Sequence, residues 1–275
     1  MRFKEYAVKK LPVAVANANA IAIAMAVCFV ALLPGCVSTT SIESKLPDQS
    51  SKSDPLRNAQ IHTERAAEYY RLSNYAVALD ATRQALRSVP SYAPAHNMLG
   101  IIYMQLGDDA QAAQSFEQAL RLAPNDSETL NNYGWFVCQR QSPANAMQYF
   151  QTALKNPLYA TPESALYNSG VCQKKVGDIK AAELQFRAAL RQQPQMAAAM
   201  YELADIEFGR GRAKEAEGLL ARHNQLIQMP SADALLLGAR IARAQGDKAA
   251  ESSYVQQLRR RFPDATQTRA AGELR

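Results

Sequence analysis

Residues 93–126 read APAHNMLGIIYMQLGDDAQAAQSFEQALRLAPND, and this stretch decides the fold. Gly107 breaks the first of two helix-forming segments, and Pro124 ends the second because proline cannot continue a helix. Gly100 and Ala112 are small, which lets the two helices approach closely as a hairpin. The stretch therefore predicts one complete helix-turn-helix unit.

The same residue types recur at a fixed step of 34 residues. Small, aromatic and turn residues keep this step at Ala78, Ala112 and Ala146, at Ala85, Ala119 and Ala153, at Gly100 and Gly134, at Phe116 and Phe150, and at Pro90 and Pro124. A 34-residue period is typical of tetratricopeptide repeats, whose units stack because one unit cannot bury its apolar face alone. We therefore predict an all-α fold, a right-handed superhelical solenoid of about six tetratricopeptide repeats, which suits a binding scaffold more than a catalyst.

These landmarks divide a repeat domain of residues 58–265 into six units. The units are at about 59–92, 93–126, 127–160, 163–196, 197–230 and 231–265. The register slips twice: Gly134 and Gly170 are 36 residues apart, and the last unit fits Gly246 and Pro263 only when it is shifted by one residue. In the fifth unit, His223 stands where a small residue is expected. Terminal units are often atypical because they cap a stack, so the shifted last unit still counts as a sixth.

Residues 1–35 read as a lipoprotein signal peptide. The segment MRFKEYAVKK carries four basic residues, and an apolar run of 13 residues follows from Ile21 to Leu33. A basic segment, a short apolar segment and a small residue before the cut are the order of a secretory signal. The alternative is a transmembrane anchor, but the run falls short of the ~20 residues that span a bilayer.

The sequence LPGC at 33–36 closes this signal and resembles the bacterial lipobox, whose cysteine is acylated and becomes the first residue of the mature protein. The resemblance implies that Cys36 carries the lipid, and several acyl chains on one cysteine give stable anchoring. An aspartate directly after the lipidated cysteine would resemble a signal for inner-membrane retention, but this position holds Val37. The expected location is therefore the outer membrane, with the lipid-anchored protein facing the periplasm.

Polar segments flank the repeats at both ends. Residues 36–57 are rich in Ser, Thr, Lys, Asp and Pro, which predicts a flexible tether between the lipid and the repeats. Residues 266–275 predict a polar tail, and the chain from Asp264 onward is expected to fray.

The composition and the motifs disfavour several function classes. The net charge of +6 falls to +3 without the four basic residues and the one acidic residue of the signal, so nucleic-acid binding gains no support. The sequence contains no glycine-rich phosphate loop, no metal-ligand spacing and no nucleophile elbow. His62, His96 and His223 lie on separate repeats, where packing is their expected role. We therefore expect no enzyme activity, no catalytic residue, no metal, no cofactor and no small-molecule substrate.

Two cysteines remain beside Cys36 once Cys28 leaves with the signal. Cys138 and Cys172 fall on the first helices of neighbouring repeats. Cys138 lies four residues after Gly134 and Cys172 lies two residues after Gly170, so their places in the repeat differ by two positions. At 100° per residue they are roughly 160° apart around their helices, so the forward side of one helix can meet the rear side of the next. Because disulfides persist in an oxidising compartment, we predict a Cys138–Cys172 disulfide. The alternative is two buried free thiols.

The run LNNYGWFVC at 130–138, the ending GD at 246–247 and RFPD at 261–264 carry a more specific resemblance. Within a lipoprotein of six such repeats, they resemble the PilF/PilW family of type IV pilus biogenesis and stability lipoproteins over nearly all of the mature chain. The resemblance implies a pilotin or pilus-stabilising factor, which helps the secretin ring of the pilus to reach the outer membrane and assemble there. The implied partner is this secretin, bound by a monomeric protein.

The first helices of such repeats line the concave face of the superhelix, and intervals of three and four select the side chains on that face. The predicted partner-binding residues are Asn97, Ile101, Met104, Asn131, Trp135, Tyr167, Val171 and Lys174. Trp, Tyr, Met and Ile together suit a peptide or a partner's helix. The alternative is that Trp135 only packs against the neighbouring repeat. A carboxylate clamp is not expected, because Ala67, Ile101, Trp135 and Val171 stand where its asparagine would be.

Two other functions stay open. A scaffold for outer-membrane barrel assembly or for cell-wall enzymes would share the anchor and the repeats, but not the NNYGWF run. An enzyme with a site hidden in the repeats is disfavoured, because the sequence holds no clustered nucleophile, base and acid. Pilus genes beside this gene would favour the pilus role.

Overall fold

The computed structural model describes residues 54–273 of the 275-residue chain. The predicted signal peptide, Cys36 and the tether up to Ser53 lie outside the described residues. The helices are α1 (Pro55–Arg71), α2 (Tyr75–Ser88), α3 (Ala93–Leu106), α4 (Asp109–Leu122), α5 (Ser127–Arg140), α6 (Pro143–Ala153), α7 (Pro162–Lys175), α8 (Ile179–Gln192), α9 (Ala197–Gly209), α10 (Ala213–Leu226), α11 (Ala232–Ala244), α12 (Lys248–Arg261) and α13 (Thr266–Gly272).

Aspartates and glycines of the sequence set where these helices begin and end. The carboxylates of Asp108, Asp126 and Asp178 each accept a hydrogen bond from the backbone N–H three residues later, at 3.1, 2.8 and 3.0 Å. Such caps satisfy a backbone donor that has no partner within the helix. Gly107 ends α3 with a φ of 78°, a left-handed conformation that glycine adopts without a Cβ clash.

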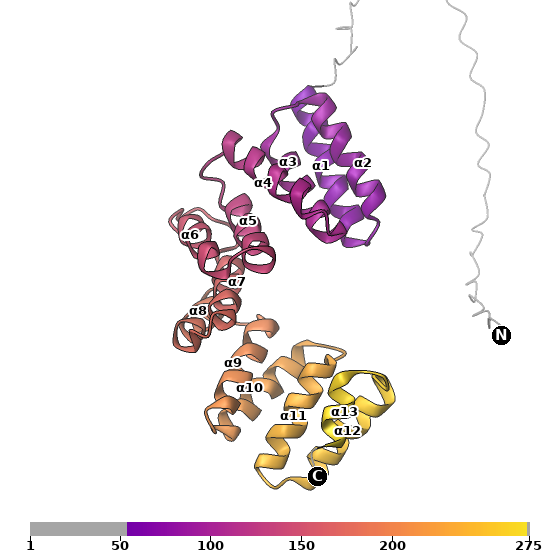
Figure 1. The fold of residues 1–275 in the computed structure, drawn as a ribbon, viewed down its shortest axis with the longest axis vertical. Coiled ribbons are helices and arrows are strands. Elements are labelled where there is room, and N and C mark those ends of the chain that lie inside the picture. The colour runs from indigo at the N-terminus through magenta and orange to yellow at the C-terminus, as the bar shows by residue number, and fades with distance from the viewer. Residues whose placement is uncertain (1–53, 274–275) are drawn as a thin grey trace, which may run out of the picture. The chain divides into compact units, whose positions relative to one another are not determined.

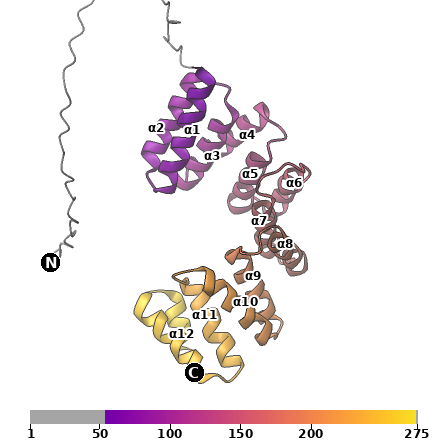
Figure 2. The same cartoon turned by 180° about the vertical axis from the view of Figure 1, so that it is seen from behind.

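The first twelve helices pair into six hairpins, α1 with α2 through α11 with α12. Neighbouring hairpins touch where the second helix of one meets the first helix of the next, and the first helices also meet as α1–α3, α3–α5 and α5–α7. The hairpins of residues 54–273 follow one another along a curved path in Figure 1, and Figure 2 shows the same order from behind. The prediction of an all-α stack of tetratricopeptide repeats is therefore confirmed.

In four of the six hairpins, an aromatic ring of the second helix lies against a glycine of the first. Phe116, Phe150 and Phe186 are fully buried on the second helices. A Cβ added to Gly100 would lie 2.6 Å from the ring of Phe116, and one added to Gly170 would lie 2.7 Å from the ring of Phe186. The recurring glycine and phenylalanine of the sequence are thus the two sides of one contact.

We expect Gly100→Ala to lower the free energy of unfolding by about 1–3 kcal/mol, because the added methyl group overlaps the buried ring of Phe116. Gly209→Ala on α9 is the matched control, since a Cβ there meets nothing within 4 Å. Urea denaturation of both variants measures the difference. Equal stability of Gly100→Ala and the wild type would contradict this packing role.

Two boundaries differ from the sequence prediction. Pro55–Arg57 belong to α1 and not to the tether, because Asp54 caps the helix by accepting from the Leu56 N–H at 3.0 Å and proline suits the first helical position. The expected fraying is wrong for Thr266–Gly272, which form α13. This helix packs on α11 and α12 and buries Ala271, so it covers apolar surface that the last hairpin would otherwise expose.

The longer step between the third and fourth repeats arises at residues 154–161, between α6 and α7. The hydroxyl of Ser127 donates to the carbonyl of Ala153 at 3.1 Å and accepts from the amide of Asn156 at 3.1 Å. These bonds hold the start of the connection against α5. Leu158 stands out from it with 87% of its surface exposed.

Candidate functional site

A pocket of about 330 Å³ is formed by the first helices of the first three hairpins together with Phe116 of α4. Tyr70 comes from α1, Ile101 and Met104 from α3, and Trp135 from α5. Its further lining residues are Gln105, Phe116, Asn132 and Arg140. Three of the eight predicted partner-binding residues, Ile101, Met104 and Trp135, therefore meet in one place, which we call the Trp135 pocket.

Trp135 has two roles in the structure. It is half-buried and packs against the core cluster that contains Phe116 and Phe136, and it also lines the pocket. Packing against its neighbours fixes the indole ring, so little side-chain entropy would be lost when a partner covers its remaining surface.

The edge of the Trp135 pocket is polar. The guanidinium of Arg140 lies 3.5 Å from the Asp109 carboxylate and 3.5 Å from the Met104 carbonyl oxygen, which it meets as a donor. Both Arg140 and Asp109 are exposed, so this ion pair contributes little to stability and the guanidinium can turn to another acceptor. An apolar pocket with a cation and amides at its edge can hold a bulky apolar side chain while bonding the polar groups beside it.

Asn97 and Asn131 are buried and bind the next repeat. Asn132 donates to the side-chain oxygen of Asn97 at 3.3 Å, and Asn168 donates to that of Asn131 at 3.0 Å. These bonds join α3 to α5 and α5 to α7. The two predicted residues hold the stack together and are only 9% and 4% exposed, so they offer a partner almost no surface.

Tyr167, Val171 and Lys174 lie on α7 and do not line the Trp135 pocket. Tyr167 and Val171 pack against the cluster around Phe186, and the rings of Tyr167 and Phe186 are 5.7 Å apart. Burial raises the pKa of the Tyr167 hydroxyl, and the nearby Glu202 adds to the shift. The structure therefore brings together the predicted residues of α3 and α5, but not those of α7.

Lys174 links α7 to α9. Its ammonium lies 2.6 Å from Asp205 and 2.7 Å from Glu202. Burial favours the neutral amine, but the hydrogen bonds to Asp205 and Glu202 outweigh it and raise the pKa of Lys174. The charge of Lys174 is therefore neutralised within the stack and is not offered to a partner.

The predicted partner-binding residues did not include five others that line the pocket: Tyr70, Gln105, Phe116, Asn132 and Arg140. A signal existed for Tyr70, since it precedes Met104 by the 34-residue step and so occupies the same place in the first repeat. Gln105, Asn132 and Arg140 carry no such signal. Their access to the pocket depends on how α3 and α5 cross.

The predicted disulfide is present between Cys138 and Cys172. Their Cα atoms are 5.9 Å apart, and both residues are buried. Cys138 lies three residues after Trp135 on α5, and Cys172 lies on α7. The bond therefore fixes the helix that carries Trp135 against the next repeat.

The described residues hold no group of three or more His, Cys, Asp or Glu side chains that could bind a metal ion. The histidines have local partners, as where the Nδ1 atom of the buried His223 lies 2.9 Å from the Ala197 carbonyl oxygen. Within residues 54–273, no helix has both the length and the apolar composition needed to span a bilayer.

Comparisons with known proteins agree with this architecture. The tetratricopeptide repeat family matches residues 63–127, 110–165 and 170–226. Among solved structures, that of PilW, described as a widely conserved type IV pilus biogenesis factor, is 36% identical, covers 77% of this chain and 97% of PilW, and has a TM-score of 0.69. A comparison with curated proteins gave no match.

Two further structures share the fold. Pseudomonas aeruginosa PilF is 23% identical over 80% of this chain and 99% of its own, with a TM-score of 0.74. A tetratricopeptide repeat protein of Thermus thermophilus is 20% identical over 68% of this chain and 98% of its own, with a TM-score of 0.55. The resemblance seen in the LNNYGWFVC run is confirmed: the chain belongs to the tetratricopeptide repeat family and, within it, to the family of PilW.

Proposed function

We propose that this chain is a periplasmic scaffold for type IV pilus biogenesis and stability, anchored in the outer membrane. It acts as a pilotin that helps the pilus secretin to reach that membrane and to multimerise. The observation that carries the proposal is the 36% identity to PilW over 97% of the PilW chain. The similarity therefore extends over nearly the whole repeat stack of PilW and is not confined to one repeat.

The Trp135 pocket is the proposed contact with the secretin. Its apolar lining and its polar edge suit one bulky apolar side chain of the partner, together with the polar groups of the neighbouring residues. The chain acts as a monomer through protein contacts alone, with no cofactor or substrate. The lipid on Cys36 and the tether that follows let the repeats reorient near the bilayer surface.

A deletion strain tests this function. We expect detergent-resistant secretin multimers to be depleted from the outer membrane while pilin and monomeric secretin are still made. The Cys36→Ala variant should be soluble or uncleaved, with a lower surface-pilus count, because it lacks the acyl chains. Its repeats should fold normally, since Cys36 precedes α1.

Each further outcome points to one alternative. Normal secretin multimers and normal piliation in the deletion strain would reject the pilus function. Normal multimers with lost pili would move the role from secretin assembly to pilus stabilisation. Normal pili with defective barrel proteins or cell wall would identify another envelope scaffold. Cys36→Ala protein of mature mobility in outer-membrane fractions would refute the lipid site.

A further inference from the structure

A second hollow lies between α8 and α10, which both pack on α9. Two adjoining cavities of about 600 and 400 Å³ share Arg187, Leu219 and Arg222, and so form one continuous depression, which we call the arginine groove. Leu203, which is 2% exposed, and the half-buried Leu219 form its apolar floor. No residue of the arginine groove lines the Trp135 pocket.

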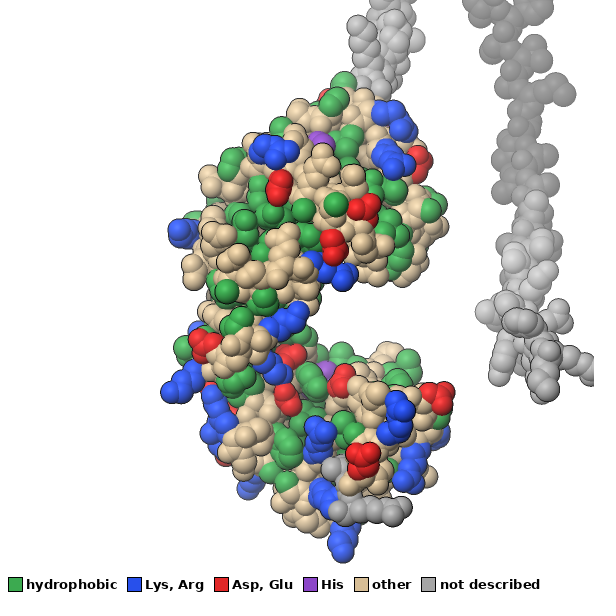
Figure 3. Space-filling view, viewed as in Figure 1, with side chains coloured by type: hydrophobic (Ala, Val, Ile, Leu, Met, Phe, Trp, Pro, Cys, Tyr) green, Lys and Arg blue, Asp and Glu red, His purple; other side chains and the backbone are tan. Residues whose placement is uncertain are grey.

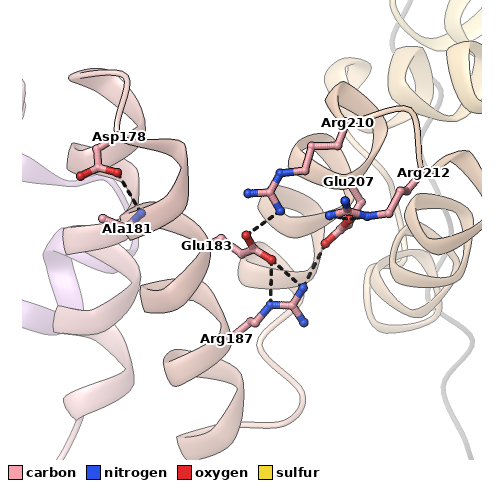
Figure 4. A network of polar contacts seen from close by, with 7 residues as sticks. All are labelled: Asp178, Ala181, Glu183, Arg187, Glu207, Arg210 and Arg212. Atoms are coloured by element: carbon pink, nitrogen blue, oxygen red, sulfur yellow. Dashed lines mark hydrogen bonds and ion pairs between the residues drawn. The ribbon is translucent and has the colours of Figure 1, made fainter.

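An ion-pair network holds the helices around the groove in place (Figure 4). Arg187 of α8 lies 2.7 Å from Glu183 and 3.0 Å from Glu207 of α9. Arg212 pairs with the other oxygen of Glu207, and Arg210 lies 2.5 Å from Glu183. Burial works to raise the pKa of Glu183, but Arg187 and Arg210 outweigh it and hold that pKa below its ordinary value. Glu183 is therefore ionised, and the carboxylates of Glu183 and Glu207 are each paired with two arginines within the protein.

Two guanidinium groups of the groove remain without an ion pair. Arg191 on α8 and Arg222 on α10 are exposed, and neither pairs with a carboxylate of the described residues. They line the same cavity as Leu203 and Leu219. In the view of Figure 3, Lys and Arg side chains also lie over the C-terminal helices, with Asp and Glu side chains among them. The groove thus combines an apolar floor with positive charge on both walls.

We propose that the arginine groove binds an extended acidic segment of a partner protein, in which carboxylates flank an aliphatic side chain. Arginine pairs well with carboxylates through charge-assisted hydrogen bonds, so Arg191 and Arg222 bind the acidic side chains. The aliphatic side chain packs on Leu203 and Leu219. The exposed Glu215 on α10 lines only the larger of the two cavities, where it repels carboxylates, so the acidic side chains lie in the smaller cavity beside Arg191 and Arg222.

Fluorescence anisotropy with a labelled peptide tests the proposal. The probe is a peptide of about a dozen residues in which leucines alternate with glutamates on a serine background, long enough to follow such a groove. We expect saturable, salt-sensitive binding to the full mature chain. The double variant Arg191→Gln/Arg222→Gln should bind about tenfold more weakly, since both charge-assisted contacts are lost. The fold should be unaffected, because neither arginine is in an ion pair.

The matched control is Arg83→Gln/Arg87→Gln on α2, which removes two exposed arginines outside the groove. This control and Trp135→Ala should bind the probe like the wild type, which separates the arginine groove from the proposed secretin contact. No saturable binding, equal binding of a glutamine version of the peptide, or equal loss in both arginine double variants would overturn the proposal. Binding to phosphatidylglycerol vesicles that depends on Arg191 and Arg222, without peptide binding, would overturn it in favour of a membrane contact.

Discussion

Replacing both Cys138 and Cys172 with alanine should lower the free energy of unfolding by about 3–4 kcal/mol. The loop that the disulfide closes spans 34 residues, and chain-entropy theory assigns a loop of that length a stabilisation of this size. Alanine leaves no buried hydroxyl without a partner, so the loss reports mainly on the crosslink. In a stack of repeats each hairpin contacts only its neighbours, so the interface between the third and fourth hairpins should weaken most.

Urea unfolding followed by circular dichroism measures this loss, and the weakened interface should appear as a broader or a divided transition. Wild-type protein in reductant is the matched control and should resemble the double variant. Thiol labelling of the denatured, unreduced mature protein should find no free cysteine. Two labelled thiols per chain, together with no effect of reductant, would contradict the disulfide.

Trp135→Ala should weaken secretin binding about thirtyfold, since truncating a central aromatic anchor costs about 2 kcal/mol or more. This prediction rests on the proposed function. In cells, the variant should lose the detergent-resistant secretin multimers that the wild type supports. Because Tyr167 packs around Phe186 in the next cluster, a change at Tyr167 would disturb the fold without touching the pocket.

Leu184→Ala is the control for Trp135→Ala, because Leu184 is 66% exposed on α8 and does not line the Trp135 pocket. It should bind like the wild type. Trp135 also packs on the core, so the melting temperature and circular dichroism of Trp135→Ala must stay near those of the wild type. A folded Trp135→Ala protein with full activity would move the contact to another surface of the repeats.

Contacts within a repeat and between adjacent repeats are the part of this fold that the sequence predicts best. The step that relates Gly100 to Gly134 and Phe116 to Phe150 encodes the ring-on-glycine contact of the second and third hairpins. The positions of Cys138 and Cys172 predicted a crosslink, because the period of a helix determines on which side of it a residue lies. The two cysteines lie on the sides of their helices that face each other. The C-terminal helix α13 escaped prediction, since its short polar sequence is helical only while Ala271 packs on the last hairpin.

The sequence alone determined the all-α repeat stack and its register, because local periodicity governs both, and it favoured the pairing of Cys138 with Cys172 over two free thiols. The tertiary structure decided which predicted surface residues remain free to bind. Asn97, Asn131 and Lys174 are engaged by neighbouring helices, whereas Ile101, Met104 and Trp135 converge with Tyr70 on one pocket. The arginine groove likewise exists only where α8 and α10 are held apart on α9. The physical reason is that the side chains around a surface residue come from other repeats. Only the packing of the repeats decides which of those side chains lie next to it.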